Sequence, residues 1–170
     1  INQAYPRIEI VFVDDGSSDQ TFFFAKRCLE SQHRVDFKLF QQLQNKGKCE
    51  AFNIAFSMCS GDVISIFGAD DIAPVFRTDL AISHMKTNYS DFVYGSYTKF
   101  FDIGGLRLAS MAKLLSLNRF YYNAVPGGAI FLSKFVATKL FPLPNCLPAE
   151  DWYISYFAEE YGYKPQKINS

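Results

Sequence analysis

The stretch of sequence that decides the fold is residues 62–71, which read D-V-I-S-I-F-G-A-D-D. Its apolar run, Val63–Phe67, is short and mostly β-branched, a pattern typical of a strand buried on both faces in a parallel sheet covered by helices. Asp70 and Asp71 follow this run, and open α/β sheets bind ligands outside the carboxyl ends of their strands. Because adjacent carboxylates repel each other, the pair indicates a site for a divalent cation. A capped turn is the alternative, since Asp also favours turns and helix N-termini.

A second acidic pair follows another apolar run near the start of the chain. Residues 8–13 (I-E-I-V-F-V) predict a buried strand, and Asp14 and Asp15 come directly after it. Gly16 permits a sharp turn, and residues 17–19 offer N-caps for a helix predicted over residues 20–32. One of these acidic residues is expected to be only a cap. Two acidic strand ends in one domain nevertheless indicate a shared site.

The composition predicts one ordered globular domain. The chain has 170 residues, 49% of them hydrophobic and 20% charged, so it can bury a substantial core. Lys and Arg together number 17, as do Asp and Glu, and this balance argues against a nucleic-acid-binding surface. Four cysteines show no C-x-x-C spacing and two histidines lie far apart, which favours free thiols in a reducing, cytoplasmic setting. No apolar run approaches the length of a membrane span.

The remaining periodicity predicts alternating strands and helices. We expect further strands at residues 35–40, 91–101 and 163–168, a loop followed by a strand within residues 125–132, and helices at residues 48–59, 77–88, 109–117 and 150–161. Asn45, Gly47 and Lys48 could meet an anion at a helix N-terminus, although a solvated loop is the reading that their spacing favours. Gly127 and Gly128 allow the backbone to approach another group closely.

Several motifs of other enzyme classes are missing from the sequence. It contains no G-x-G-x-x-G after a strand, no P-loop, no G-x-S-x-G and no H-E-x-x-H, which argues against dinucleotide enzymes, P-loop NTPases, serine hydrolases and zinc proteases. Three carboxylate pairs remain, at residues 14–15, 70–71 and 150–151. Without a nucleophile motif, such pairs suit a metal-bound diphosphate leaving group together with a general base.

In their order along the chain, these motifs resemble the family 2 glycosyltransferases, which are inverting enzymes with the GT-A fold that binds nucleotide-diphospho-sugars. The resemblance covers almost the whole chain. It rests on V-D-D-G-S-S-D at 13–19, N-K-G at 45–47, the pair at 70–71, Pro74, residues 127–132, E-D-W at 150–152 and G-Y at 162–163. It implies a three-layer α/β/α domain with a mostly parallel central sheet.

The resemblance also implies the donor-binding residues. Asp15 would contact the uracil or ribose of a UDP-sugar, with Asp14 alongside it or in a structural role. Asp71 and Asp70 would supply the family's D-x-D-type function and hold Mn²⁺ or Mg²⁺ on the diphosphate. Lys48 would approach the donor. Many relatives carry one more Asp two residues before the acidic pair, where this chain has glycine at position 68.

On the acceptor side, the resemblance implies that Asp151 is the catalytic base and that Glu150 assists it. Asp151 would deprotonate the acceptor hydroxyl for in-line attack at the anomeric carbon. Gly127 and Gly128 would line the acceptor side. The acceptor would be a glycan or a lipid-linked molecule, as in polysaccharide or cell-surface glycan synthesis, on the cytoplasmic side and at the inner face of the membrane in the full-length protein.

The resemblance further implies that residues 1–170 are a single domain truncated at the N-terminus and at the C-terminus. The family's first strand, which lies in the middle of its sheet, would precede residue 1. The processive-synthase signature Q-x-x-R-W is absent, so a non-processive enzyme is expected. Three alternatives stay open: a sugar-nucleotide-binding domain without transfer activity, a Mg²⁺-dependent phospho-acceptor receiver-like module, and a nucleotidyltransferase of the same general fold.

Overall fold

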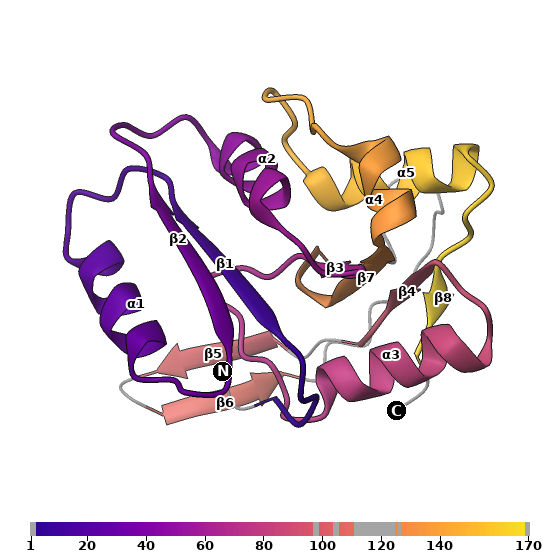
Figure 1. Ribbon diagram of the computed structural model, residues 1–170, viewed down its shortest axis with the longest axis horizontal. Coiled ribbons are helices and arrows are strands. Elements are labelled where there is room, and N and C mark those ends of the chain that lie inside the picture. Colours follow the sequence, from indigo (N-terminus) through magenta and orange to yellow (C-terminus); the bar gives the residue numbers. More distant parts are fainter. Residues whose placement is uncertain (1–2, 97–98, 104–105, 111–124, 126, 169–170) are drawn as a thin grey trace.

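The computed structural model describes residues 3–96, 99–103, 106–110, 125 and 127–168, which Figure 1 shows from one side. Its strands are β1 (Glu9–Asp14), β2 (Asp36–Gln41), β3 (Val63–Ser65), β4 (Phe92–Tyr94), β5 (Lys99–Ile103), β6 (Leu106–Ser110), β7 (Ile130–Ser133) and β8 (Gln166–Lys167). Its helices are α1 (Thr21–Glu30), α2 (Lys48–Met58), α3 (Arg77–Thr87), α4 (Lys134–Leu140) and α5 (Glu150–Glu160), with a 3₁₀ turn, η1 (Gly127–Ala129), before β7.

The described strands form three sheets. β1 pairs parallel with β2, and β5 pairs antiparallel with β6. The third sheet has the order β3-β7-β4-β8, in which β7 runs antiparallel to both of its neighbours and β8 runs parallel to β4.

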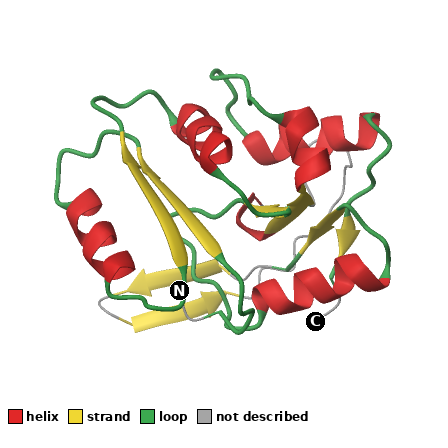
Figure 2. Ribbon diagram, viewed as in Figure 1, coloured by secondary structure: helices red, strands yellow, loops and turns green. Residues whose placement is uncertain are grey.

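Helices cover both faces of this four-stranded sheet, as Figures 1 and 2 show for α4 on one side and α3 on the other. The side chains of β4 and β7 alternate between two apolar clusters because successive residues of a strand point to opposite faces. Phe92, Ile130 and Leu132 pack in the larger cluster with α2, α4 and α5. Val93 and Phe131 pack in the smaller cluster with Ala81 and Met85 of α3. The three-layer α/β/α class expected from the sequence is therefore confirmed.

The pairing within the sheet differs from the mostly parallel sheet that we expected. In the four-stranded sheet, two of the three described pairings are antiparallel. The apolar run Val63–Phe67 is also not one strand buried on both faces: β3 ends at Ser65, whose side chain is exposed, and pairs antiparallel with β7. An apolar composition indicates that a strand is buried, but it does not indicate whether the neighbouring strand runs parallel or antiparallel to it.

A groove of about 560 Å³ separates β1 from β3. Among the described strands, β1 pairs only with β2, and β3 pairs only with β7, so each has one edge without a strand beside it. The two sides of the groove are formed by β1 residues such as Ile10 and by residues 63–67, and apolar side chains of α2 such as Phe52 and Phe56 also line it. The sheet is thus divided at this point.

Several predicted element boundaries were wrong. The strand predicted over residues 91–101 is two short strands, β4 and β5. Of the helix predicted over residues 109–117, the first two residues belong to β6 and the others lie outside the described residues. Among the residues that the structure describes, no helix is both long enough and apolar enough to cross a membrane.

Candidate active site

The first acidic pair closes the turn between β1 and α1. The Asp14 side chain is buried, and its carboxylate accepts hydrogen bonds from Ser17 and, at 3.0 Å, from Gln41 Nε2. Gly16 has a φ of 73°, in the region that favours glycine, and a Cβ here would lie 2.6 Å from the Asn45 backbone nitrogen. The turn therefore needs glycine because it packs directly against the next loop.

Asp15 holds that next loop, which leads into α2. Its carboxylate accepts hydrogen bonds from Gln42 Nε2 (2.7 Å), the Lys46 backbone N–H (2.8 Å) and the Gly47 backbone N–H (2.9 Å). Both carboxylate oxygens thus have partners within the protein. The resemblance assigns Asp15 to the donor's uracil or ribose, and that role stays a prediction; the structure gives Asp15 a role in ordering residues 42–47.

Lys48, the first residue of α2, connects this loop to the third acidic pair. Its ammonium group forms an ion pair with the Glu150 carboxylate. The hydrogen bond to Glu150 raises the pKa of Lys48, although partial burial acts in the opposite direction. Glu150 and Asp151 begin α5, and the partial positive charge at a helix N-terminus favours carboxylates there. Asp151 Oδ1 accepts a hydrogen bond from the Trp152 backbone N–H at 2.8 Å.

The two glycines of η1 lie between the third acidic pair and the second. A Cβ on Gly127 would lie 3.5 Å from Asp151 Cβ and 3.6 Å from Glu150 Oε1. A Cβ on Gly128 would lie only 2.1 Å from Asp71 Oδ2. The absence of side chains at these positions therefore lets the backbone of η1 contact carboxylates from two separate segments.

The second acidic pair lies in a tight turn after β3. The Asp71 backbone N–H donates to the Gly68 carbonyl at 3.3 Å, and the Gly68 N–H donates to Asp71 Oδ2 at 3.2 Å. A Cβ on Gly68 would lie 2.8 Å from Asp70 Oδ1. Glycine at position 68, the one departure from the family's acidic pattern at this site, thus gives the backbone room beside both carboxylates.

The structure brings together most of the site residues predicted from the sequence; the exception is Asp14, whose carboxylate accepts hydrogen bonds from Ser17 and Gln41 instead. A continuous series of contacts runs from Asp15 through Gly47 and Lys48 to Glu150, and from there through η1 to Asp71. These residues come from four separate stretches of the chain. The arrangement places one carboxylate pair at each end of η1.

Asp70 and Asp71 are chemically suited to a divalent cation. Both side chains are exposed, and the Asp71 carboxylate occupies the space that a side chain on Gly128 would fill. In the described part of the chain, no group of three or more His, Cys, Asp or Glu side chains could hold a metal ion. Two carboxylates fit Mg²⁺ or Mn²⁺ that takes its other ligands from phosphate and water, as Mg²⁺ commonly does.

Sequence reasoning missed two kinds of residue in this region. Gln41 and Gln42 pair with the first acidic pair, and Arg77 donates hydrogen bonds to Ser65 Oγ and to the Gly128 carbonyl. One signal in the sequence could have pointed to Arg77. A cation in the first turn of a helix opposes the helix dipole, so it calls for a partner elsewhere.

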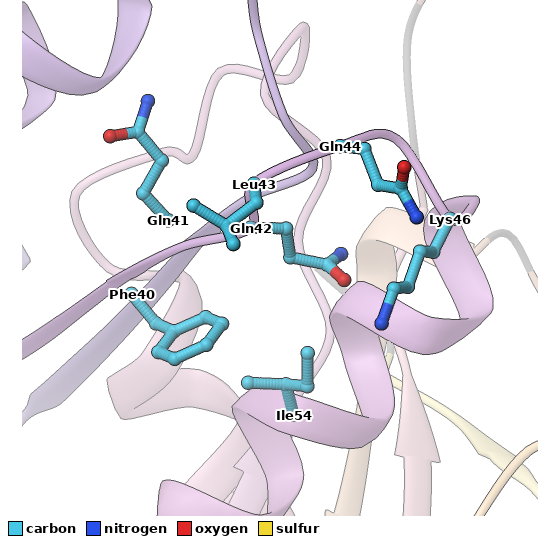
Figure 3. Close-up of a pocket in the computed structure, with 7 residues that line it drawn as sticks. All are labelled: Phe40, Gln41, Gln42, Leu43, Gln44, Lys46 and Ile54. Carbon is cyan, nitrogen blue, oxygen red and sulfur yellow. The ribbon is translucent and has the colours of Figure 1, made fainter.

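A separate pocket of about 440 Å³ lies beside the end of β2, where Figure 3 shows Phe40 and Ile54 on one side and Gln42 and Lys46 on the other. No acidic residue lines it. It nevertheless adjoins the candidate active site, because Gln41 and Gln42 also donate hydrogen bonds to Asp14 and Asp15.

Comparison with known proteins identifies relatives of the chain. The family profile described as "Glycosyl transferase family 2" matches residues 1–135. A protein of Haemophilus influenzae named "Uncharacterized glycosyltransferase" is 30% identical over 153 residues, which cover 85% of this chain and 58% of that protein. The Escherichia coli "UDP-Glc:alpha-D-GlcNAc-diphosphoundecaprenol beta-1,3-glucosyltransferase WfgD" is 33% identical over 97 residues, which cover 57% of this chain and 37% of that protein. The chain thus matches only part of the length of these relatives.

Solved structures share the fold. The mannosyltransferase PcManGT from Pyrobaculum calidifontis, in complex with GDP-Man and Mn²⁺, has a TM-score of 0.77 and 19% identity, over 98% of this chain and 47% of that chain. Staphylococcus aureus TarS in complex with UDP has a TM-score of 0.69 and 19% identity, over 98% of this chain and 51% of that chain. At this identity, the likeness establishes the α/β architecture of GT-A glycosyltransferases, which was predicted from the sequence.

Proposed function

Because the chain belongs to glycosyl transferase family 2, we propose that it transfers a sugar from a UDP-sugar to an acceptor hydroxyl, with inversion at the anomeric carbon. The observation that carries this proposal is the series of contacts from Asp15 through Lys48, Glu150 and η1 to Asp71. It puts a carboxylate pair suited to a cation near a second pair suited to proton transfer. A nucleotide-sugar transferase needs both functions in one site.

On the donor side, Asp70 and Asp71 would hold Mn²⁺ or Mg²⁺. The ion would neutralise the charge that develops on the departing diphosphate. Asp14 and Asp15 would act at the nucleoside end, where Asp15 also orders the loop before α2. Support for UDP comes from the names of relatives: WfgD uses UDP-Glc, and TarS was solved with UDP. PcManGT was solved with GDP-Man, so the nucleotide has to be tested directly.

On the acceptor side, Asp151 would take the proton from the attacking hydroxyl. It lies in the first turn of α5 beside η1, and a general base must lie within reach of the proton that it removes. Glu150 would assist, held in place by its ion pair with Lys48. Gly127 and Gly128 would line the space between base and donor, because their backbone contacts carboxylates of both pairs.

The acceptor that we propose is a glycan or a lipid-linked molecule in polysaccharide or cell-surface glycan synthesis, as the name of WfgD suggests. The cytoplasmic setting, at the inner face of the membrane, is also a proposal. It is supported by the cysteines, all four of which are free, since disulfides are rare in reducing compartments.

The groove between β1 and β3 supports a proposal about the domain. We propose that it holds a further strand, the family's first, because two strand edges without partners face it and apolar side chains line it. An added strand would protect the backbone N–H groups along these edges. Hydrogen exchange at Val11 and Val63, whose N–H groups point away from β2 and β7, should therefore slow when such a strand is joined before residue 1. Equal exchange with and without the strand would contradict this.

Calorimetric titration of UDP, with and without Mn²⁺, tests the donor site. We expect the protein to bind UDP more tightly with Mn²⁺ and expect Asp71→Ala to lose that gain. Asp36→Ala, which removes an exposed carboxylate at the start of β2, is the matched control and should bind as the unmodified protein does. If the folded protein binds GDP but not UDP, the donor assignment is wrong; if it binds neither, the proposed function is wrong.

Asp151→Asn separates transfer from binding alone. Removal of the base should lower turnover by about 10²–10⁴-fold and leave Mn²⁺-dependent UDP binding unchanged. If the unmodified protein and Asp151→Asn both bind UDP and neither transfers sugar to any acceptor, a sugar-nucleotide-binding domain without activity is favoured. The receiver-like alternative does not agree with the antiparallel pairing of β7 with β3 and β4, because receiver domains have a doubly wound parallel sheet.

A further inference from the structure

Arg77, the first residue of α3, joins two segments that form the candidate active site. Its Nη2 donates hydrogen bonds to the Gly128 carbonyl oxygen at 2.7 Å and to Ser65 Oγ at 2.9 Å. The Ser65 hydroxyl donates in turn to the Ile130 carbonyl at 2.9 Å. One guanidinium group therefore connects the end of β3 to η1 and to the start of β7.

The surroundings of the Arg77 guanidinium keep it in place. Its central carbon lies 4.3 Å from the centre of the Phe131 ring and 5.1 Å from that of the Phe67 ring. Burial lowers the pKa of Arg77 to about 10, and the negative charge of Asp71 acts in the opposite direction, so the side chain stays charged at neutral pH. A cation at a helix N-terminus opposes the helix dipole. Two hydrogen-bond acceptors, two aromatic rings and a nearby carboxylate offset that cost.

The Gly128 hydrogen bond links Arg77 to the orientation of Asp71. The space that a Cβ of Gly128 would fill is taken by the Asp71 carboxylate, whose Oδ2 also accepts from the Gly68 N–H. Asp71 is exposed and forms no described ion pair. Its rotamer is thus limited by the backbone on either side of it. Arg77 fixes one of those two backbone segments.

We propose that Arg77 is a positioning residue of the metal and diphosphate site, because it holds the Gly128 peptide against Asp71 and so keeps that carboxylate in the orientation that binds the cation. This inference rests on the proposed function. Arg77 acts here through Gly128 and Asp71, without contact to the nucleotide. Groups that orient a metal ligand typically change metal affinity by about 10–100-fold when they are removed.

The quantity that tests the inference is the gain in UDP affinity that Mn²⁺ produces, measured by calorimetry as the ratio of the two dissociation constants. We expect Arg77→Met to reduce this ratio about tenfold or more and to leave UDP affinity without metal unchanged. Arg27→Met is the matched control, because Arg27 also lies over an aromatic ring, Phe23, but on α1. It should leave the ratio unchanged.

Hydrogen exchange and a second variant keep the test decisive. The N–H groups of residues 128–130 should exchange faster in Arg77→Met, since η1 loses its hydrogen bond to α3. If Arg77→Met does not fold, Arg77→Lys takes its place. Lysine keeps the positive charge but is shorter, so the ratio of UDP dissociation constants without and with Mn²⁺ should be lower than in the unmodified protein. A lysine variant with the full ratio would overturn the inference.

The remaining outcomes separate this inference from the proposed function. Failure of the unmodified protein to bind either UDP or GDP with Mn²⁺ would refute the proposed function, and this inference with it. Normal binding by the unmodified protein and an unchanged ratio in Arg77→Met would refute the positioning role alone. A loss of UDP affinity without metal would mean that Arg77 contacts the nucleotide directly, which also contradicts the inference.

Discussion

Replacing Gly128 by Ala tests whether Asp71 and η1 form one site. The new Cβ would lie 2.1 Å from Asp71 Oδ2 and 2.9 Å from Asp71 Cγ. The shorter distance is about 1.3 Å less than the 3.4 Å at which ordinary van der Waals contact begins. Either the carboxylate turns away or η1 shifts, and the hydrogen bond from Arg77 to the Gly128 carbonyl opposes the shift.

The size of the effect follows from these two ways of relieving the overlap. A side chain forced off its preferred rotamer costs about 0.5–1.5 kcal/mol, and overpacking that moves the backbone costs about 1–3 kcal/mol. Since about 1.4 kcal/mol corresponds to a tenfold change in affinity, we expect Mn²⁺-dependent UDP affinity to fall about 10–100-fold. Asp71 is exposed, so it can turn into solvent in the free protein, and the melting temperature should change little.

The matched control is Gly127→Ala, one residue earlier. Its Cβ would lie 3.5 Å from Asp151 Cβ, which is an ordinary van der Waals contact. The three atoms nearest to this Cβ belong to Asp151 and Glu150, and none of them belongs to Asp71. Calorimetry should find its Mn²⁺-dependent UDP affinity unchanged, and any effect should appear in the KM for the acceptor. If Gly128→Ala binds Mn²⁺ and UDP as the unmodified protein does, the contact between Gly128 and Asp71 has no part in the site. Equal losses in both variants would point to a general disturbance of η1.

Three further substitutions test other contacts. Partial burial opposes ionisation of Glu9, but hydrogen bonds from Lys38 and from Ser60 outweigh it and lower the pKa of Glu9 to about 2. The stabilisation by ionised Glu9 should be complete above about pH 4.5 and disappear as the pH falls towards 2. In urea melts, the free energy of unfolding of Glu9→Gln should therefore be about 1–3 kcal/mol below that of the unmodified protein at pH 7 and almost equal to it at pH 2. Asn53→Ala removes two hydrogen bonds, of 2.8 and 2.6 Å, to the backbone of the loop between α4 and α5; denaturant melts should show a loss of about 1–3 kcal/mol, and a loss near zero would contradict it. Lys48→Met removes the ion pair that holds Glu150, so assays should show a lower kcat/KM with a melting temperature close to that of the unmodified protein; unchanged kinetics would show that the ion pair has no role in transfer.

The acidic pairs and their places at the ends of strands or the start of a helix could be predicted from the sequence. Each is a local signal, because a run of apolar residues, a turn-forming glycine and the carboxylates lie within about ten residues of one another. The same holds for the start of α5 at Glu150 and for the glycines at 127 and 128. What these residues bind and catalyse is still a prediction from resemblance.

The direction of the strands could not be predicted in the same way. Val63–Ser65 has the apolar, β-branched composition of a parallel strand, yet its partner is β7, whose paired residues lie 66 to 70 positions later in the chain and run antiparallel to it. Composition records the burial of a strand, and burial is similar for either direction of the neighbour. The groove beside β3 likewise depends on which strands pair, which no single stretch of sequence specifies.

The sequence by itself determined which residues have the chemistry for the site: carboxylates in pairs, glycines without side chains, and a lysine at a helix start. Only the tertiary structure decided which of them touch. The place of Arg77 at a helix start indicates that it needs a partner, but only the structure shows that this partner is the Gly128 carbonyl, some fifty positions later. Local patterns reflect backbone preferences and average burial. Contacts between distant segments depend on how helices and strands pack, and that packing brings Asp71, Gly128 and Asp151 to one place.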